Sequence, residues 1–244
     1  MFSNSAKELP CNNLVLAASY RHCPVGLLID QSGSMAENQS IAGKAINAFI
    51  TKLKQRDATG GAIDLGISVY NHQYEQLCPF RSLKYAPENI SPCAAGGTRA
   101  DIAIPQFLRE VQSFKHDVLR DNCVSYGRAF IFHITDGFSD GDMGIVARTV
   151  SKLESSKSIR FFTIAVPGAN IPQISIYTDK SRILNLTNQS DFESSLESIM
   201  KSLAILSASS ANVNSGSLAW QNSHLYEVED RQAAEYLAAF SLQD

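Results

Sequence analysis

The sequence lacks any apolar run that approaches the roughly 20 residues a helix needs to cross a bilayer. Its N-terminus carries Lys7, Glu8 and Pro10 where a signal peptide has its apolar core, and the apolar stretch 14–18 is too short to serve. We therefore expect a cytoplasmic protein that makes no contact with a membrane.

The sequence also lacks paired cysteines and an excess of positive charge. Its five cysteines are an odd number with no Cys-x-x-Cys pair, so neither a disulfide framework nor a zinc site is indicated. We expect free thiols that are buried or half-buried.

The net charge is −3, and no run of Lys and Arg forms a basic patch. Because nucleic acid requires a basic face, we do not expect nucleic acid as a partner.

What the chain does contain is enough apolar sequence for one large α/β domain. Of its 244 residues, 44% are hydrophobic. We interpret residues 1–22 as an N-terminal arm, 23–206 as the domain, and 207–244 as a linker and tail with a possible short helix. Strands are predicted at 25–29, 63–70, 74–80, 129–134, 161–166 and 183–186, and helices around 42–53, 107–118, 146–153 and 190–203. The short turn at 71–73 predicts a hairpin, and hence one antiparallel edge on a parallel sheet.

The first predicted strand ends abruptly in polar residues. After the apolar run that ends at Ile29 come Asp30, Ser32 and Ser34, three oxygen side chains at alternate positions in a Gly-containing loop. Such side chains can converge on one hard cation, and oxygen-only ligation favours Mg²⁺, Mn²⁺ or Ca²⁺ over zinc. An ordinary polar turn is the alternative, because this short pattern also occurs by chance.

A second apolar strand ends in the same way about a hundred residues later. The run 129–134 leads into Thr135-Asp136-Gly137, so Asp30 and Asp136 can face each other at one edge of the sheet. Between them the loop-like stretch 81–97 leads to Thr98. Thr98 and Asp101 fit a helix capping box, which competes with metal ligation for the same hydroxyl.

Other polar residues close to these loops have simpler interpretations. Asp140 and Asp142 are expected to be solvated loop acids rather than ligands of a second cation. His133, inside a strand, is expected to pack in the core or on a sheet face. Arg99, next to Thr98, is a candidate contact for an acidic group on a partner.

Three motifs, in their order, resemble the metal-ion-dependent adhesion site (MIDAS) of von Willebrand factor A (VWA) domains. They are Asp-Gln-Ser-Gly-Ser from Asp30 to Ser34, Gly-Gly-Thr at 96–98 and Thr-Asp-Gly at 135–137. The resemblance covers about residues 23–205. Within the family, the segment 24–35, the Ala-Gly-Gly-Thr loop and the Ile-Ala-Val-Pro-Gly strand end are similar to bacterial VWA proteins associated with tellurium resistance.

The resemblance implies a doubly wound, Rossmann-like α/β fold with a mostly parallel sheet, one antiparallel edge strand and helices on both faces. It also implies Mg²⁺, with Mn²⁺ possible, at the sheet edge. Ser32, Ser34 and Thr98 would supply hydroxyl oxygens, and Asp30 and Asp136 would act largely through bound water. A carboxylate from a partner protein would take the sixth position.

Three functions compete on this basis. The leading hypothesis is a non-enzymatic, Mg²⁺-dependent protein-interaction module, with a phosphatase or kinase of a bacterial stress-response system as the partner that the resemblance suggests. The second is a metal-dependent phosphohydrolase, for which only Asp140 and His133 are nearby acid–base candidates. No Gly-x-Ser-x-Gly, Walker A or His-Glu-x-x-His pattern supports it. The third is a subunit that recruits substrates to an AAA+ ATPase.

The tail leaves two alternatives open. Its apolar residues at helical spacing, such as Tyr236 and Phe240, either fold back on the domain or dock a partner. In the first case one of its acids, Glu227, Glu229 or Asp230, can compete for the metal at high effective concentration.

Overall fold

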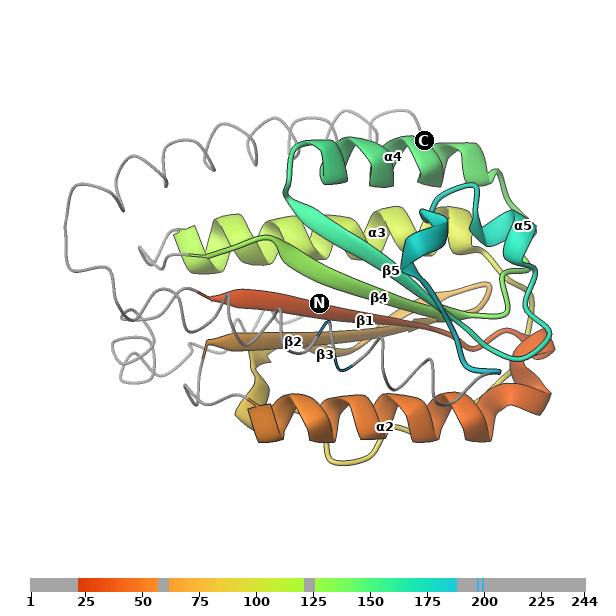
Figure 1. Cartoon of the computed structure of the whole chain (residues 1–244), viewed down its shortest axis with the longest axis horizontal. Helices are drawn as coiled ribbons and strands as arrows, with labels where there is room; N and C mark the ends of the chain where they lie inside the picture. The colour runs from red at the N-terminus through yellow and green to blue at the C-terminus, as the bar shows by residue number, and fades with distance from the viewer. Residues whose placement is uncertain (1–21, 57–61, 121–125, 188–196, 198, 200–244) are drawn as a thin grey trace, which may run out of the picture.

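The computed structural model describes residues 22–56, 62–120, 126–187, 197 and 199. In these residues six strands form one sheet in the order β3-β2-β1-β4-β5-β6 (Figure 1). Neighbouring strands are parallel except β2 and β3, which pair antiparallel at one edge. The strands are β1 Cys23–Asp30, β2 Ile63–Tyr70, β3 Tyr74–Ser82, β4 Ala129–Thr135, β5 Ile159–Ala165 and β6 Ile183–Asn185.

Helices lie on both faces of this sheet. In Figure 1, α2 lies on one face, and α3 and α4 lie on the other. The helices are α2 Gln39–Arg56, α3 Ala100–Ser113, α4 Met143–Ser155 and the short α5 Ile171–Ile174. Three 3-10 helices, η1 Gly33–Asn38, η2 Leu83–Tyr85 and η4 Lys180–Arg182, and the π-helix η3 Phe114–Arg120, which continues α3, complete the described elements. The prediction of a doubly wound α/β fold with one antiparallel edge strand is confirmed.

The two helical layers bury two apolar clusters, one on each face of the sheet. All eight residues of β1 and all seven of β4 are buried, which explains why their sequences are nearly continuous apolar runs. Gly26 interrupts the run of β1 because α3 packs directly against the strand: a Cβ there would lie 2.7 Å from the ring of Phe107. The central strands are therefore enclosed by packed helices, and this packing positions their carboxyl ends.

The predicted strands agree with those observed to within a few residues at each end. The predicted helix at 190–203 (apart from residues 197 and 199), the N-terminal arm and the tail lie outside the described residues. The described cysteines, Cys23, Cys78 and Cys93, are free thiols, the first two buried and the third exposed. No described helix has the length and apolar character that a membrane span needs.

Candidate functional site

The two acids that end the central strands meet at the same edge of the sheet. Asp30 is the last residue of β1, and Asp136 follows the last residue of β4. The strands are neighbours in register, with Ile29 opposite Ile134. Both acids are buried, with 0% and 3% of their surface exposed. The parallel pairing thus brings together two carboxylates that are 106 positions apart in the sequence.

Asp30 is held by three donors. Its Oδ1 accepts a hydrogen bond from the Ser32 backbone N–H at 2.8 Å, and its Oδ2 accepts from Thr135 Oγ1 at 2.7 Å and Tyr70 Oη at 3.2 Å. The pKa of Asp30 is nevertheless raised to about 6, because burial and, to a smaller extent, the charge of Asp136 outweigh the lowering by the hydrogen bonds. A carboxylate in this position is stabilised in its charged form by a nearby cation.

The two serine hydroxyls of the first loop lie next to each other. Ser32 Oγ and Ser34 Oγ are 3.1 Å apart. Adjacent oxygens of an octahedral Mg²⁺ site, with Mg–O distances of about 2.1 Å, are separated by about 3.0 Å. Ser32 is buried, whereas Ser34 is exposed to solvent. The pair therefore has the spacing of two neighbouring ligands and opens toward the surface.

Backbone contacts tie the Thr98 loop to the first loop. The N–H of Gly33 donates to the carbonyl oxygen of Gly96 at 2.9 Å, and the N–H of Ala95 donates to Gln31 at 2.8 Å. Gly96 has φ of +78°, and a Cβ at this position would collide with the ring of His72. Glycine is required here for both reasons. The sharp turn at Gly96 sets the position of Thr98.

A second set of contacts ties Thr98 to the loop after β4. The Thr98 N–H donates to Asp140 Oδ2 at 3.0 Å, and the Asp140 N–H donates to the Thr98 carbonyl at 2.9 Å. Asp140 is exposed, as expected of a solvated loop acid, but it is not free, because it accepts the hydrogen bond from Thr98. Asp142 is not free either, because it caps α4 by accepting from the Gly144 N–H at 2.8 Å. Both acids organise the loop that follows Asp136.

The predicted capping box at the start of α3 does not form. The N-cap of α3 is Arg99, without a side-chain cap, so the hydroxyl of Thr98 is not used to begin the helix. Asp101 instead accepts from Nε and Nη2 of Arg99, each at 2.9 Å. The guanidinium of Arg99, a candidate contact for a partner acid, thus already has an internal carboxylate.

Sequence reasoning missed a buried chain of side chains behind Asp30. Tyr70 Oη lies 2.8 Å from His133 Nε2, and His133 Nδ1 lies 3.3 Å from Tyr177 Oη. His133 is fully buried, which lowers its pKa to about 3. A neutral His133 that carries its proton on Nε2 donates to Tyr70 and accepts from Tyr177. With this tautomer both hydrogen bonds of His133 have one donor and one acceptor. The prediction of a core role for His133 is confirmed.

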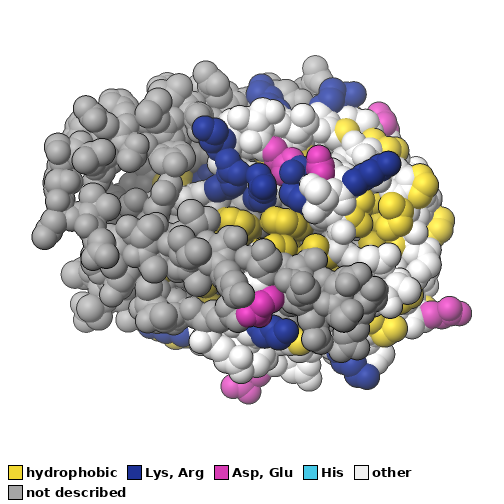
Figure 2. Space-filling view, viewed as in Figure 1, with side chains coloured by type: hydrophobic (Ala, Val, Ile, Leu, Met, Phe, Trp, Pro, Cys, Tyr) yellow, Lys and Arg dark blue, Asp and Glu magenta, His cyan; other side chains and the backbone are white. Residues whose placement is uncertain are grey.

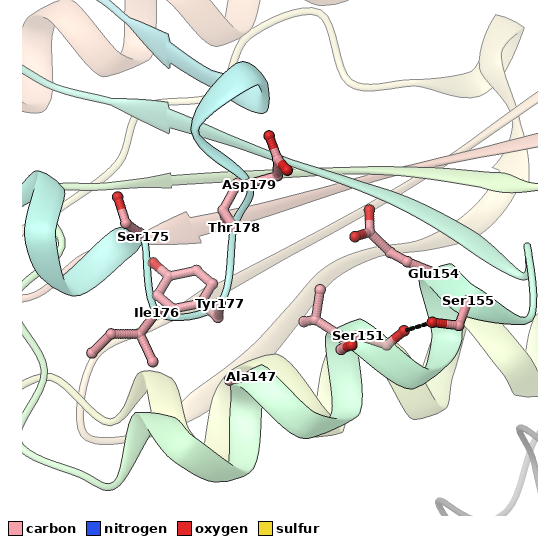
Figure 3. A pocket seen from close by; sticks show the side chains of 10 residues that line it. Ala147, Ser151, Glu154, Ser155, Ser175, Ile176, Tyr177, Thr178 and Asp179 are labelled. Carbon is pink, nitrogen blue, oxygen red and sulfur yellow. Dashed lines mark hydrogen bonds between the residues drawn. The ribbon is translucent and has the colours of Figure 1, made fainter.

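A separate hollow lies between α4 and residues 175–179 (Figure 3). Its volume is about 240 Å³, and none of the predicted site residues lines it. Glu154, on its wall, forms an ion pair with Arg182 at 2.6 Å. Tyr177 connects this wall to His133, so the buried chain runs from the hollow to Asp30.

The donor set at the sheet edge has a definite chemical character. The described part of the chain contains no group of three or more His, Cys, Asp or Glu placed to hold a metal ion. The set at this edge combines two carboxylates with hydroxyls, all of them oxygen donors. Oxygen donors suit hard divalent cations, and soft thiolate or imidazole ligation is absent from this set.

Comparison with known proteins identifies the fold. No protein-family model and no curated protein matches the sequence. Solved structures do match: proximal thread matrix protein 1 (PTMP1) from the mussel byssus with a zinc-occupied MIDAS motif has a TM-score of 0.53 and 15% identity, over 77% of this chain and 47% of that one.

Two bacterial structures are similar to a comparable degree. The pilus adhesin SpaC from Lactobacillus rhamnosus GG gives a TM-score of 0.56 at 12% identity, over 75% of this chain and 30% of that chain. The PilB minor pilin from Streptococcus sanguinis gives 0.51 at 13%, over 76% and 62%. The present chain therefore spans less than two thirds of these proteins. The similarity establishes the Rossmann-like α/β fold of VWA domains.

Proposed function

We propose that this chain is a Mg²⁺-dependent protein-interaction module of the MIDAS type. In this proposal Ser32, Ser34 and Thr98 supply hydroxyl oxygens, and Asp30 and Asp136 act through bound water. The observation that carries it is the convergence of three loops at one sheet edge, with the two serine oxygens 3.1 Å apart. The zinc-occupied MIDAS of the byssus protein supports a divalent cation in this fold.

Neutral ligands explain why such a site binds a partner. Three hydroxyl oxygens do not neutralise a divalent cation, so the ion retains a strong attraction for a further anion. An Asp or Glu carboxylate from a second protein provides that anion. Mn²⁺, which accepts the same oxygen ligands, is the alternative cation.

The contacts of two residues favour binding over hydrolysis. A phosphohydrolase needs a general acid or base beside the metal. His133 is fully buried with a lowered pKa, and Asp140 is engaged by Thr98. His133 and Asp140 are the two acid–base candidates that the sequence offers near the site. Because both are engaged in other contacts, we propose a module without enzymatic activity.

Two classes of partner fit the proposal. A phosphatase or kinase of a cytoplasmic stress-response system, which the resemblance to tellurium-resistance-associated VWA proteins suggests, and an AAA+ ATPase both fit a metal-bridged contact. The tagged protein is incubated with lysate of its host in Mg²⁺ or in EDTA, together with Ser34→Ala and, as a matched control, Ser40→Ala. Both serines are exposed, so neither change threatens the fold. Retention of the same protein by wild type and Ser40→Ala in Mg²⁺, and its loss in EDTA and with Ser34→Ala, supports the proposal. Equal retention in all arms contradicts it.

A further inference from the structure

Tyr70 lies beside Asp30 and opposite it in the sheet. The two residues are partners in the parallel pairing of β1 with β2. Tyr70 Oη is 3.2 Å from Asp30 Oδ2, and the same oxygen is 2.8 Å from Nε2 of His133. The phenol oxygen therefore stands between a carboxylate and an imidazole, two groups that can both accept its single hydrogen.

One arrangement of the hydrogens supplies every contact in this string. An ionised Asp30 only accepts, so its 3.2 Å contact uses the hydrogen of Tyr70. Tyr70 then has no hydrogen left for His133, and the 2.8 Å contact uses a hydrogen on Nε2 of the ring. A neutral ring protonated at Nε2 has a bare Nδ1, which accepts from Tyr177 Oη at 3.3 Å. All three hydrogens are thus directed toward Asp30.

The reverse arrangement is worse for Asp30. If His133 carries its hydrogen on Nδ1, that nitrogen donates to Tyr177, and Nε2 takes the hydrogen of Tyr70. The Tyr70 oxygen then faces Asp30 Oδ2 with a lone pair, and Thr135 is the only described side chain that still donates to this oxygen. Hydrogen bonds to a charged acceptor are about twice as strong as those between neutral groups, so the charge of Asp30 selects the first arrangement.

The string is enclosed by the protein. Tyr70, His133 and Tyr177 are 1%, 0% and 6% exposed. Both tyrosines belong to the apolar cluster that includes residues of α3 and α4, and the ring of Phe161 lies 6.2 Å from that of His133. No described histidine is visible on the face shown in Figure 2. Bulk water is therefore not available to replace a partner that is removed by mutation.

The donors divide the two oxygens of Asp30 between the sheet and the first loop. Oδ2 accepts from Thr135 and Tyr70, which come from the two strands that flank β1. Oδ1 accepts from the backbone N–H of Ser32, in the loop that carries the proposed serine ligands. Two donors on Oδ2 therefore fix the rotation of the carboxylate and keep Oδ1 on the side of this loop. Removing such a supporting hydrogen bond typically weakens metal binding by about 10–100-fold.

We propose that Tyr70 is a positioning residue for the metal site, and that His133 holds the Tyr70 hydroxyl in the direction that Asp30 requires. This inference rests on the proposed function and deepens it, because it names the groups that hold one of the two acids in place. Tyr177 completes the string without setting its direction: when its hydroxyl is absent, Tyr70 is still the acceptor for the Nε2 hydrogen. Two buried tyrosines that contact the same imidazole thus have different roles.

Nitrogen NMR of the histidine rings and calorimetric titration with Mg²⁺ test the inference together. The proteins are wild type, Tyr70→Phe and the matched control Tyr177→Phe, each produced with isotope-labelled histidine. The spectrum of His133→Gln identifies the signals of His133. Recorded on the metal-free proteins at slightly alkaline pH, the spectra show which ring nitrogen carries the hydrogen.

The two tyrosine variants are expected to differ in both measurements. Wild type should carry the His133 hydrogen on Nε2. Tyr70→Phe removes the acceptor at Nε2, so the hydrogen should move to Nδ1 and donate to Tyr177, and the affinity for Mg²⁺ should fall by about tenfold or more. Tyr177→Phe should keep the hydrogen on Nε2 and the wild-type affinity for Mg²⁺.

Three results would count against the inference. A hydrogen on Nδ1 in wild type overturns it without any variant, so the test does not depend on the folding of Tyr70→Phe. An affinity for Mg²⁺ that is unchanged in Tyr70→Phe, or equally reduced in both tyrosine variants, overturns the positioning role and leaves the proposed function intact. Absence of Mg²⁺ binding by wild type contradicts the proposed function itself, and the positioning role with it.

Discussion

Thr135 donates its hydroxyl hydrogen to Asp30 Oδ2 over 2.7 Å, joining the ends of the neighbouring strands β4 and β1. The same Oγ1 accepts the N–H of Gly137 at 2.9 Å, at the start of the turn that contains Asp136. One threonine side chain thus fixes the orientation of the first acid and the path of the chain after the second.

Replacing Thr135 by valine tests this relationship. The change keeps the shape but leaves a buried carboxylate oxygen with one donor fewer, for which we expect a loss of about 1–3 kcal/mol in the free energy of unfolding. Urea unfolding in EDTA measures it. Thr149→Val is the control, because that buried hydroxyl donates only to the Ile145 carbonyl within α4. Equal losses for the two variants would show that Thr135 has no special relation to Asp30.

The turn at Gly96 leads to a prediction about both the stability of the protein and its affinity for Mg²⁺. Gly96→Ala forces a side chain into a left-handed conformation, at about 1–2 kcal/mol, and against the ring of His72. Gly168→Ala carries the same conformational cost at φ of +79°, but its Cβ meets nothing within 4 Å. Calorimetric titration with Mg²⁺ should show weakened binding for Gly96→Ala and wild-type binding for Gly168→Ala. A wild-type affinity in Gly96→Ala would mean that this turn does not position Thr98.

The buried His133 predicts a pH dependence of stability. Its pKa is about 3 in the folded protein and near 6.5 when exposed, so between these values the unfolded chain binds one more proton. Its contribution to stability is complete above pH 6.5 and falls by about 1.4 kcal/mol per pH unit below it. The ring faces Tyr70, Tyr177 and Phe161, and Asp30 lies behind Tyr70.

Comparison of wild type with His133→Gln isolates this effect from that of Asp30. The raised pKa of Asp30 has the opposite effect on the pH dependence of stability. The folded protein binds the Asp30 proton more tightly than the unfolded chain does, so the protein loses stability as the pH rises toward 6. The free energies of unfolding of both proteins are measured in EDTA from pH 4.5 to 7.5 and plotted against pH. The slope should be steeper in wild type than in His133→Gln, by the equivalent of up to one proton. Parallel curves for the two proteins would contradict a neutral, buried His133.

Much of the fold was predictable because the central strands are buried on both faces. Such strands are continuous apolar runs that stop where the sheet ends. The apolar runs therefore predicted β1 and β4, and the ends of the runs predicted where Asp30 and Asp136 lie. The hairpin of β2 and β3 was equally predictable, from the alternation in 63–70, the short turn at 71–73 and the second short run that follows it.

The environment of the site was not predictable, since it depends on contacts between distant segments. Tyr70 and Thr135 reach Asp30 because β2 and β4 flank β1, an order that local periodicity does not reveal. The capping box at Thr98 failed because Arg99 attracts Asp101. Asp140 is the exposed loop acid that was expected, but its hydrogen bond with Thr98 was not predictable, because nothing in its own loop indicates a donor 42 positions earlier.

The most direct test of the account is a calorimetric titration of Mg²⁺, and in parallel Mn²⁺, into the metal-free protein. Wild type and Ser40→Ala should bind one cation per chain, while Ser34→Ala and Asp136→Asn should bind it at least about tenfold more weakly, as expected for the loss of one ligand or its charge. Circular dichroism confirms that the variants are folded. Absence of binding by wild type, or equal binding by all four proteins, would contradict a cation site at Asp30, Ser32, Ser34, Thr98 and Asp136.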